Sequence, residues 1–345
     1  MEVNLIRRKT VFVVGAGASF ELGLPLGETL LQRIADALDY RIDYSEVSGG
    51  SKEILRALGA AAGQNGIEFR EYVNAALRVR TAAHLGLSID NIVHQQNSDH
   101  LLVEVAKIAI AYQILSAEEA SCLRIPDQPS EPTWPEIRGT WLGRFAQILV
   151  QDVTKSNLDI IFDNISIISF NYDRTIRRAL PNILTSQFGI SDVAASELAK
   201  RLKIFHPYGS LGGLYWEDTS NIVQFGSPQT ANLLQVSKNI RTFTEQTRDG
   251  EKLSAMKTAL SSADQIVFLG FGYLSQNMQL ILSNVHGCAM SVTGTSLGLS
   301  EPDTEIVSNQ VSQFFKTEFR PHKTPYLRPL KCHEFLRENF RSITA

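Results

Sequence analysis

Short apolar runs that end in a glycine or a polar turn recur along the chain and predict buried strands. The first run, Thr10 to Val14, is rich in β-branched residues and stops at Gly15. Continuous runs of this kind are typical of parallel strands that are covered on both faces. The later runs are Ile165 to Phe170, Lys203 to Phe205 and Gln265 to Leu269, with a weaker candidate from Ala289 to Thr293.

Between these runs the apolar positions change to helical spacing. Leu30, Ile34 and Leu38 recur every four residues, so we expect a helix with one apolar face from about Glu28 to Leu38. Helices are also predicted from Asp192 to Leu202 and from Glu251 to Leu260. Strands that alternate with helices indicate the α/β class, with a Rossmann-like parallel sheet.

The segment from residue 40 to 155 has a different character. Three apolar stripes at helical spacing lie within it, around Phe69 to Leu77, Leu101 to Tyr112 and Trp141 to Leu149, with no convincing alternating strand between them. We therefore predict a helical insertion over 40–155. The Rossmann-like domain is then discontinuous, over 1–39 and 156–300, and 301–345 is a C-terminal extension available to form an interface.

Composition narrows the class of protein. The 345 residues carry 33 Lys and Arg against 36 Asp and Glu, a net charge of −3, which disfavours direct nucleic-acid binding. Hydrophobic residues make up 43%, which excludes a disordered chain. The three cysteines, Cys122, Cys288 and Cys332, form no Cys-x-x-Cys pair, so neither a disulfide framework nor a four-cysteine zinc site is expected. No stretch approaches 18 apolar residues, and we expect a cytoplasmic protein without a membrane span.

Polar and glycine-rich segments follow the predicted strands. They are Gly15-Ala16-Gly17-Ala18-Ser19, Asn171-Tyr172-Asp173, His206 to Ser210, and Gly270-Phe271-Gly272. Ligands of open parallel sheets bind at the carboxyl ends of the strands, and glycines allow the backbone to approach a pyrophosphate. Each segment also has a structural interpretation: a tight turn, an Asx turn or helix cap, or a satisfied loop histidine.

Together, these segments resemble a known family. Gly-Ala-Gly-x-Ser-x-x-x-Gly-Leu-Pro, over residues 15–25, is similar to the signature of the sirtuin superfamily, which binds NAD in a Rossmann-like fold. Ser169 to Asp173 resembles the sirtuin Thr-Gln-Asn-x-Asp motif. His206 with Gly209 and Ser210 resembles its His-Gly-Ser motif, with Pro207 and Tyr208 inserted, and 269–274 stands where a later nucleotide loop occurs.

The resemblance implies that NAD is the substrate. Asn171 would hold the ribose hydroxyls and water, His206 would act as general base with an ordinary pKa of ~6.5, and Asp173 would orient the ribose or support the histidine. Cleavage at a cationic pyridinium needs no general acid on its nitrogen. The residues expected to bind NAD are Gly15, Ala16, Gly17, Ser19, Pro25, Asp90, Gly270 and Gly272.

The departures from the deacylase pattern select a branch of the family. The zinc ribbon of the deacylases is missing, and Leu26-Gly27-Glu28 replaces the usual Asp-Phe-Arg. A zinc-free domain with a helical insertion resembles bacterial NAD-hydrolysing effectors of anti-phage defence, as does the segment Leu87-Ser88-Ile89-Asp90. This branch implies an NAD+ glycohydrolase that drains NAD and is restrained by homo-oligomerisation, by a separate sensor or regulatory protein, or by a nucleotide signal. The alternatives are an NAD-dependent protein deacylase and a catalytically silent nucleotide-binding regulator.

Overall fold

Six parallel strands form the central sheet of the computed structural model, which describes residues 6–44, 46–124, 134–217, 220–246, 250–320 and 322–344. In sheet order they are β5 (Lys203–Phe205), β4 (Ile165–Ser169), β1 (Thr10–Val14), β6 (Gln265–Leu269), β7 (Ser291–Thr295) and β8 (Tyr326–Arg328). Every pairing is parallel. Numbered along the chain, this is the 3-2-1-4-5-6 order of the Rossmann fold, so the predicted fold class is confirmed.

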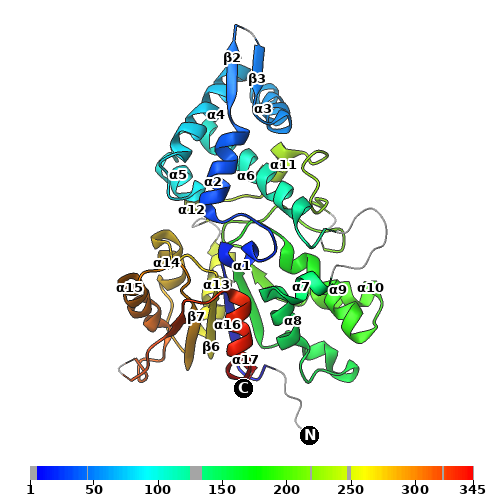
Figure 1. The fold of residues 1–345 in the computed structure, drawn as a ribbon, viewed down its shortest axis with the longest axis vertical. Coiled ribbons are helices and arrows are strands. Elements are labelled where there is room, and N and C mark those ends of the chain that lie inside the picture. The colour runs from blue at the N-terminus through cyan, green and yellow to red at the C-terminus, as the bar shows by residue number, and fades with distance from the viewer. Residues whose placement is uncertain are drawn as a thin grey trace.

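Helices cover both faces of the sheet (Figure 1). Phe12, Ile167 and Val267 point to one face, where they pack with helices from several parts of the chain. Val13, Ile168 and Phe268 point to the other, as the two-residue period of a strand requires. The first face carries α7 (Trp134–Arg138), α8 (Trp141–Val150), α9 (Thr175–Phe188), α10 (Asp192–Ala199), α16 (Cys332–Glu338) and α17 (Phe340–Thr344); the second carries α13 (Gly250–Ser261), α14 (Ser275–Leu282) and α15 (Glu301–Val311).

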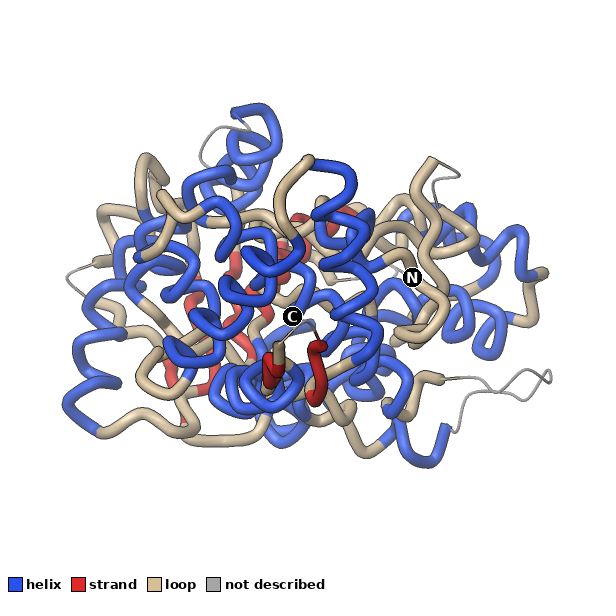
Figure 2. Tube along the Cα trace, turned by 90° about the horizontal axis from the view of Figure 1, so that it is seen from above, coloured by secondary structure: helices blue, strands red, loops and turns tan. Residues whose placement is uncertain are grey.

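A second group of helices lies beyond the carboxyl ends of the strands and forms the upper half of the molecule in Figure 1. We call this group the helical cap. Its members pack mainly around one long helix, α6, and Figure 2 shows helices surrounding the strands when the molecule is seen from above. The cap consists of α2 (Gly27–Ala37), α3 (Lys52–Asn65), α4 (Phe69–Ala83), α5 (Ile89–Gln95), α6 (His100–Ala120) and α11 (Leu233–Ser237).

The helix α6 has the length and mean hydropathy of a membrane span, 1.4 over its most apolar window, although the sequence led us to expect no such stretch. Of that window, 61% is buried inside the protein. Contacts with α2, α3, α4, α5 and α11 surround it. Its apolar character is therefore explained by its place at the centre of the cap.

Two parts of the secondary structure differ from the expectation. A hairpin of β2 (Tyr40–Asp43) and β3 (Glu46–Gly49) interrupts the segment that was expected to be helical throughout. The strand β7 starts two residues later than its predicted start at Ala289, and β8 was not predicted. The remaining short elements are α1 (Ala16–Phe20), α12 (Phe243–Gln246), and the 3-10 helices Lys155–Ile160 and Ser312–Phe314.

The packing also bears on the predicted domain boundaries, which stay a prediction. The helix α2, which precedes residue 40, packs on α4 and α6 of the cap. The helix α8, which precedes residue 156, packs instead on α9 and α16 beside the sheet. In the C-terminal segment, β8 extends the sheet and α16 contacts α8 and β7.

Candidate active site

Asn171 lies directly beyond β4 and joins that strand end to the loop after β1. Its side-chain amide donates one hydrogen bond to the backbone oxygen of Gly15 (2.9 Å) and one to Ser19 Oγ (2.7 Å). Both amide hydrogens are thereby used, and the side chain is buried. No described residue donates to Asn171 Oδ1, so this oxygen is the part of the side chain that is available to a ligand.

Asp173 completes a buried chain of hydrogen bonds. Ser19 Oγ, which accepts from Asn171, donates to Asp173 Oδ2 (2.6 Å). The other carboxylate oxygen accepts from the backbone nitrogen of Thr175 (3.0 Å) and from its hydroxyl (2.5 Å). Both oxygens of Asp173 therefore hold the start of α9 and the loop after β1, and neither contacts His206.

His206 follows β5, the strand beside β4. Its Nδ1 lies 3.2 Å from the backbone oxygen of Asn171, and because a carbonyl only accepts, Nδ1 must be the protonated nitrogen. The other nitrogen, Nε2, then carries no proton. It is shielded from solvent and has no hydrogen-bond partner among the described residues. Burial, with a smaller contribution from the charge of Arg177, lowers the pKa of His206 to about 3. The imidazole is thus neutral at pH 7.

The glycines of the two predicted nucleotide loops pack against each other. Gly15 donates its backbone N–H to Leu269, and Gly17 donates to Gly270 (2.9 Å). Gly270 has φ of +57°, and a Cβ there would lie 2.1 Å from the backbone nitrogen of Ala18. A Cβ on Gly17 would lie 2.8 Å from the Cα of Gly270. These loops meet where the strand order reverses between β1 and β6, the usual ligand crevice of such sheets.

Asp90 reaches the site through a residue that the sequence did not single out. The hydroxyl of Tyr172, between Asn171 and Asp173, donates to Asp90 Oδ1 on α5 of the cap. Burial raises the pKa of Asp90, and the bond from Tyr172 acts against this shift. Ser88 caps α5 by accepting from the backbone nitrogen of Asn91 (3.1 Å). Through the bond between Tyr172 and Asp90, the helical cap holds the loop that carries Asn171.

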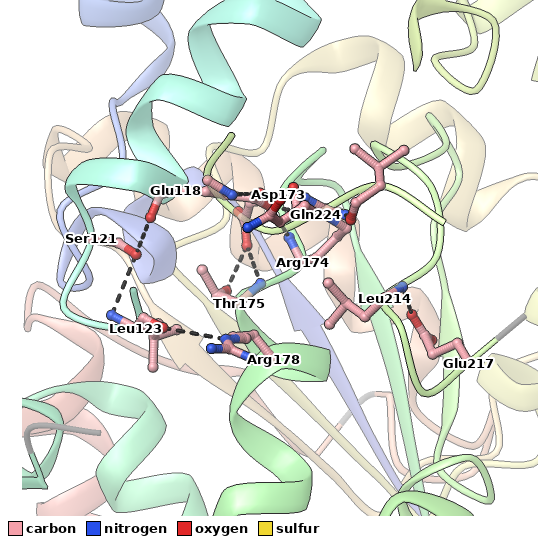
Figure 3. A network of polar contacts seen from close by, with 12 residues as sticks. Glu118, Ser121, Leu123, Asp173, Arg174, Thr175, Arg178, Leu214, Glu217 and Gln224 are labelled. Carbon is pink, nitrogen blue, oxygen red and sulfur yellow. Dashed lines mark hydrogen bonds and ion pairs between the residues drawn. The ribbon is translucent and has the colours of Figure 1, made fainter. Parts of the chain in front are cut away.

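A buried ion pair supports the same loop (Figure 3). Arg174 and Glu118, at the end of α6, both have fully covered side chains, and Arg174 Nε donates to Glu118 Oε1 (3.1 Å). Glu118 also accepts from the backbone nitrogens of Arg174 (3.1 Å) and Gly226 (3.2 Å). Arg174 donates further to the backbone oxygens of Val223 and Gln224. Three distant segments are joined at this pair.

The structure brings most of the predicted residues together. Gly15, Ser19, Asn171, Asp173 and His206 belong to one hydrogen-bonded cluster, which we call the strand-end cluster. Gly17 and Gly270 form the loop contact beside it, and Ala16 begins α1. Pro25 is buried shortly before α2, and Gly272 is exposed, with open space around its Cα.

The sequence analysis missed four residues that hold the site together: Glu118, Tyr172, Arg174 and Thr175. Thr175 could have been found from Asp173, because an Asp at a strand end commonly forms an Asx turn by accepting from the backbone nitrogen two residues later. Glu118 carries a weaker signal, because it stands with Glu119 at the end of a largely apolar helix and the sequence does not distinguish the two. Within the described residues, no group of three His, Cys, Asp or Glu side chains is arranged to hold a metal ion.

Comparison with known proteins gives structural likeness only. No family model matches the sequence, and no curated protein matches it either. Among solved structures, one similar chain is a Sir2 homologue in complex with NAD, with 12% identity, a TM-score of 0.41, and coverage of 98% of this chain and 90% of the other. Another is a mutant Sir2 homologue in complex with ADP-ribose, with 13% identity, a TM-score of 0.38, and coverage of 99% and 94%.

Proposed function

We propose that this protein is an NAD+ glycohydrolase, which converts NAD+ and water into ADP-ribose, nicotinamide and a proton. The observation that carries the proposal is that Nε2 of His206, in the strand-end cluster, is unprotonated, buried and without a hydrogen-bond partner among the described residues. An unpartnered polar atom that is buried costs free energy unless a ligand supplies its partner. A ribose hydroxyl or a water molecule has the donor that Nε2 lacks.

The chemistry needs what the cluster offers. Cleavage of the nicotinamide–ribose bond passes through an oxocarbenium-like state, as other glycosidic cleavages do. Nicotinamide leaves as a neutral molecule from a cationic pyridinium, so no group must protonate it. Asn171 Oδ1 would accept from a ribose hydroxyl, and His206 Nε2 would accept the proton of the attacking water.

The low pKa of His206 sets a condition on this step. A general base works best when its pKa lies near the operating pH, and a value of about 3 is far below it. The described conformation therefore fits a resting enzyme, in which His206 is neutral but a weak base. Substrate that opens the contacts around Nε2 would let the pKa of His206 rise towards its ordinary value.

A role in defence follows from the resemblance of the sequence to anti-phage effectors. Such an enzyme would deplete cellular NAD on infection, in the cytoplasm, and its resting state would be held by a partner protein or by self-association. The weak base of the described conformation is compatible with such restraint. Nicotinamide release by the purified protein, alone and with candidate partners, measures the restraint directly.

The test of the activity uses the full chain with NAD+ and a chelator, with and without an acetylated peptide, and identifies the products by mass. Water as acceptor predicts ADP-ribose and nicotinamide in equal amounts, without dependence on the peptide. His206→Ala should lose about 10²–10⁴-fold in rate, since this is the usual worth of a positioned base. The matched control, His286→Ala, changes an exposed histidine and should keep the wild-type rate.

Three outcomes would contradict the proposal. Strict dependence on the peptide, with O-acetyl-ADP-ribose as the main product, would show a deacylase. Binding of NAD+ without turnover under every condition would show a silent regulator. Full activity of a folded His206→Ala variant would remove the histidine from the mechanism.

A further inference from the structure

A cavity of about 380 Å³ lies between α8 and the two C-terminal helices, α16 and α17. Its volume is within the range of small-molecule sites, about 300–1,000 Å³. The lining consists of Arg144 and Gln147 of α8, Arg337 and Glu338 of α16, and Phe340 and Arg341 of α17. None of these residues belongs to the strand-end cluster, and α17 lies at the end of the sheet away from the helical cap (Figure 1). The cavity is therefore separate from the candidate active site.

The walls of this cavity are packed helices. Phe145 of α8 and Phe335 of α16 are fully buried in one core cluster, and the two helices contact each other directly. Glu21, the residue after α1, holds both helices at their first turns. Its carboxylate accepts from the backbone nitrogen of Trp141 (2.7 Å) and from that of His333 (3.1 Å). The helices therefore present the side chains of the lining at positions set by the core.

Arg144 carries a buried donor that the protein leaves without a partner. Its Nη1 donates to Gln147 Oε1 (3.0 Å), one turn further along α8. Its Nε is shielded from solvent and has no hydrogen-bond partner among the described residues. A buried donor of this kind costs free energy unless a ligand supplies an acceptor. Because Arg144 lines the cavity and Gln147 is neutral, both the donor and the positive charge of Arg144 are available to an anion there.

The balance of charge in the lining stays positive when every ion pair is counted. Glu338 is the one acidic residue among the described lining residues, and it lies 3.6 Å from Arg337 Nη2. If Arg337 and Glu338 are taken to neutralise each other, two cations remain, Arg144 and Arg341. Within the described part of the chain, neither of these two arginines is paired with a carboxylate. Their two charges favour an anion in the cavity.

We infer that this cavity binds a small phosphate-bearing molecule through the guanidinium groups of Arg144 and Arg341. A guanidinium presents its N–H donors in a planar fork that matches two phosphate oxygens. Phe340, half-buried in the same lining, offers a ring on which the base of a nucleoside phosphate stacks. The inference is independent of the proposed function, since the cavity shares no residue with the strand-end cluster.

Calorimetry on the full chain tests the binding, with pyrophosphate and AMP as separate probes and without NAD+. We expect saturable binding of at least one probe. Its dissociation constant should rise about tenfold or more in Arg144→Gln and in Arg341→Gln, because each variant loses a charge-assisted contact. Arg341 is exposed, so Arg341→Gln should keep the wild-type fold. The matched control, Arg56→Gln, removes the same charge from an exposed position on α3 of the helical cap and should bind as the wild type does.

The two probes distinguish the sources of the phosphate. Tighter binding of AMP than of pyrophosphate, lost in Phe340→Leu, would identify a nucleoside phosphate, whereas the reverse order would identify an inorganic one. An unchanged dissociation constant in both cavity variants would place the probe elsewhere, for example at the glycine loops, and would overturn the inference. An equal loss in Arg56→Gln, or no saturable binding at millimolar concentration, would overturn it as well. Absence of NAD+ turnover would count against the proposed function alone.

Discussion

At the scale of the residue, a single asparagine connects the ends of three strands. Asn171 holds the β1 loop with its two amide hydrogens and holds His206 with its backbone oxygen. Only Oδ1 remains for a ligand. Substitution of Asn171 therefore acts on the stability of the site and on its chemistry at once, and a test must separate the two effects.

Asn171→Ala should lower the rate of NAD+ cleavage by about 10²–10³-fold, as loss of a positioned polar group does. It should also cost about 1–3 kcal/mol of unfolding free energy, because Ser19 and Gly15 lose buried partners. The matched control is Asn164→Ala at the opposite end of β4, where the amide also bonds a backbone oxygen, that of Ile6 (2.9 Å). The control should lose stability but keep the rate, and steady-state kinetics with urea unfolding measures both. Equal rate losses in the two variants would reduce the role of Asn171 to stability.

The buried imidazole of His206 predicts a dependence of stability on pH. An unfolded histidine takes up a proton below pH ~6.5, whereas the folded His206 does so only near pH 3. The unfolded chain thus binds more protons in this window, and the stability contributed by the neutral imidazole is lost as the pH falls below 6.5. Between pH 7.5 and pH 5 the wild type should lose at most about 2 kcal/mol more than His206→Asn. Urea unfolding at both pH values checks this, and equal losses in the two proteins would contradict the buried, neutral state.

At the scale of the element, the glycine loops after β1 and β6 are built to fit each other. A side chain at Gly17 would meet Gly270 before it met any ligand, so a substitution there tests the packing of the loops first and nucleotide binding second. The requirement for glycine in this motif is therefore already explained by the protein alone.

Gly270→Ala should lower the unfolding free energy by about 1–3 kcal/mol, because its Cβ would overlap the backbone of Ala18 at a positive φ. Gly272→Ala is the matched control two residues later, where a Cβ meets nothing within 4 Å. Thermal unfolding of both variants measures the difference. A Gly270→Ala protein as stable as the control would show that the two loops can separate without cost.

Burial explains in part which strands could be predicted, although the half-buried β5 was predicted as well. β1, β5 and β6 were predicted with their observed bounds, and β1 and β6 are buried along their whole length, which produces unbroken apolar runs. β8 is a three-residue edge strand with largely exposed side chains, and the hairpin of β2 and β3 is mostly polar. β8 is defined by its pairing with the distant β7, and the hairpin, although it pairs locally, has no buried apolar face, so neither leaves an apolar pattern to detect.

The candidate site was predictable in its residues but not in its contacts. Glycines, Asn171, Asp173 and His206 stand at strand ends, and the sheet brings strand ends together. The resemblance implied that Asp173 would orient the ribose or support the histidine; in the structure its oxygens bond Ser19 and Thr175 and not His206. Side-chain partners depend on the fold around each residue, and for this reason the sequence did not predict these contacts. The catalytic roles stay a prediction until the activity is tested.

At the scale of the whole molecule, the cap and the sheet meet through buried polar contacts at the site. Tyr172 bonds Asp90 of α5, and Arg174 bonds Glu118 of α6. Tyr172 and Arg174 stand directly before and after Asp173 in the chain. These two contacts fix the position of the loop that carries Asn171 and Asp173 relative to the cap.

Glu118→Gln should lower the unfolding free energy by about 3–5 kcal/mol, because it leaves the charge of Arg174 buried and unpaired. Glu197→Gln removes a carboxylate from an exposed pair with Lys200 and should cost less than about 1 kcal/mol. Urea unfolding compares the two variants. If the Glu118 variant were no less stable than the Glu197 variant, the pair would not be needed to join the cap to the sheet.

The strand order also determines when the candidate site can be completed during synthesis of the chain. β1, at the centre of the sheet, leaves the ribosome first, but its neighbours β4 and β6 follow about 150 and 250 residues later. At roughly 5–20 residues per second, the first strand waits for tens of seconds before its second partner exists. The loop of Gly270, which closes onto Gly17, arrives with that partner. A nascent chain therefore lacks the complete strand-end cluster and its glycine loops until most of it has been translated, and under the proposed function this order would protect the cell from NAD+ consumption by unfinished copies.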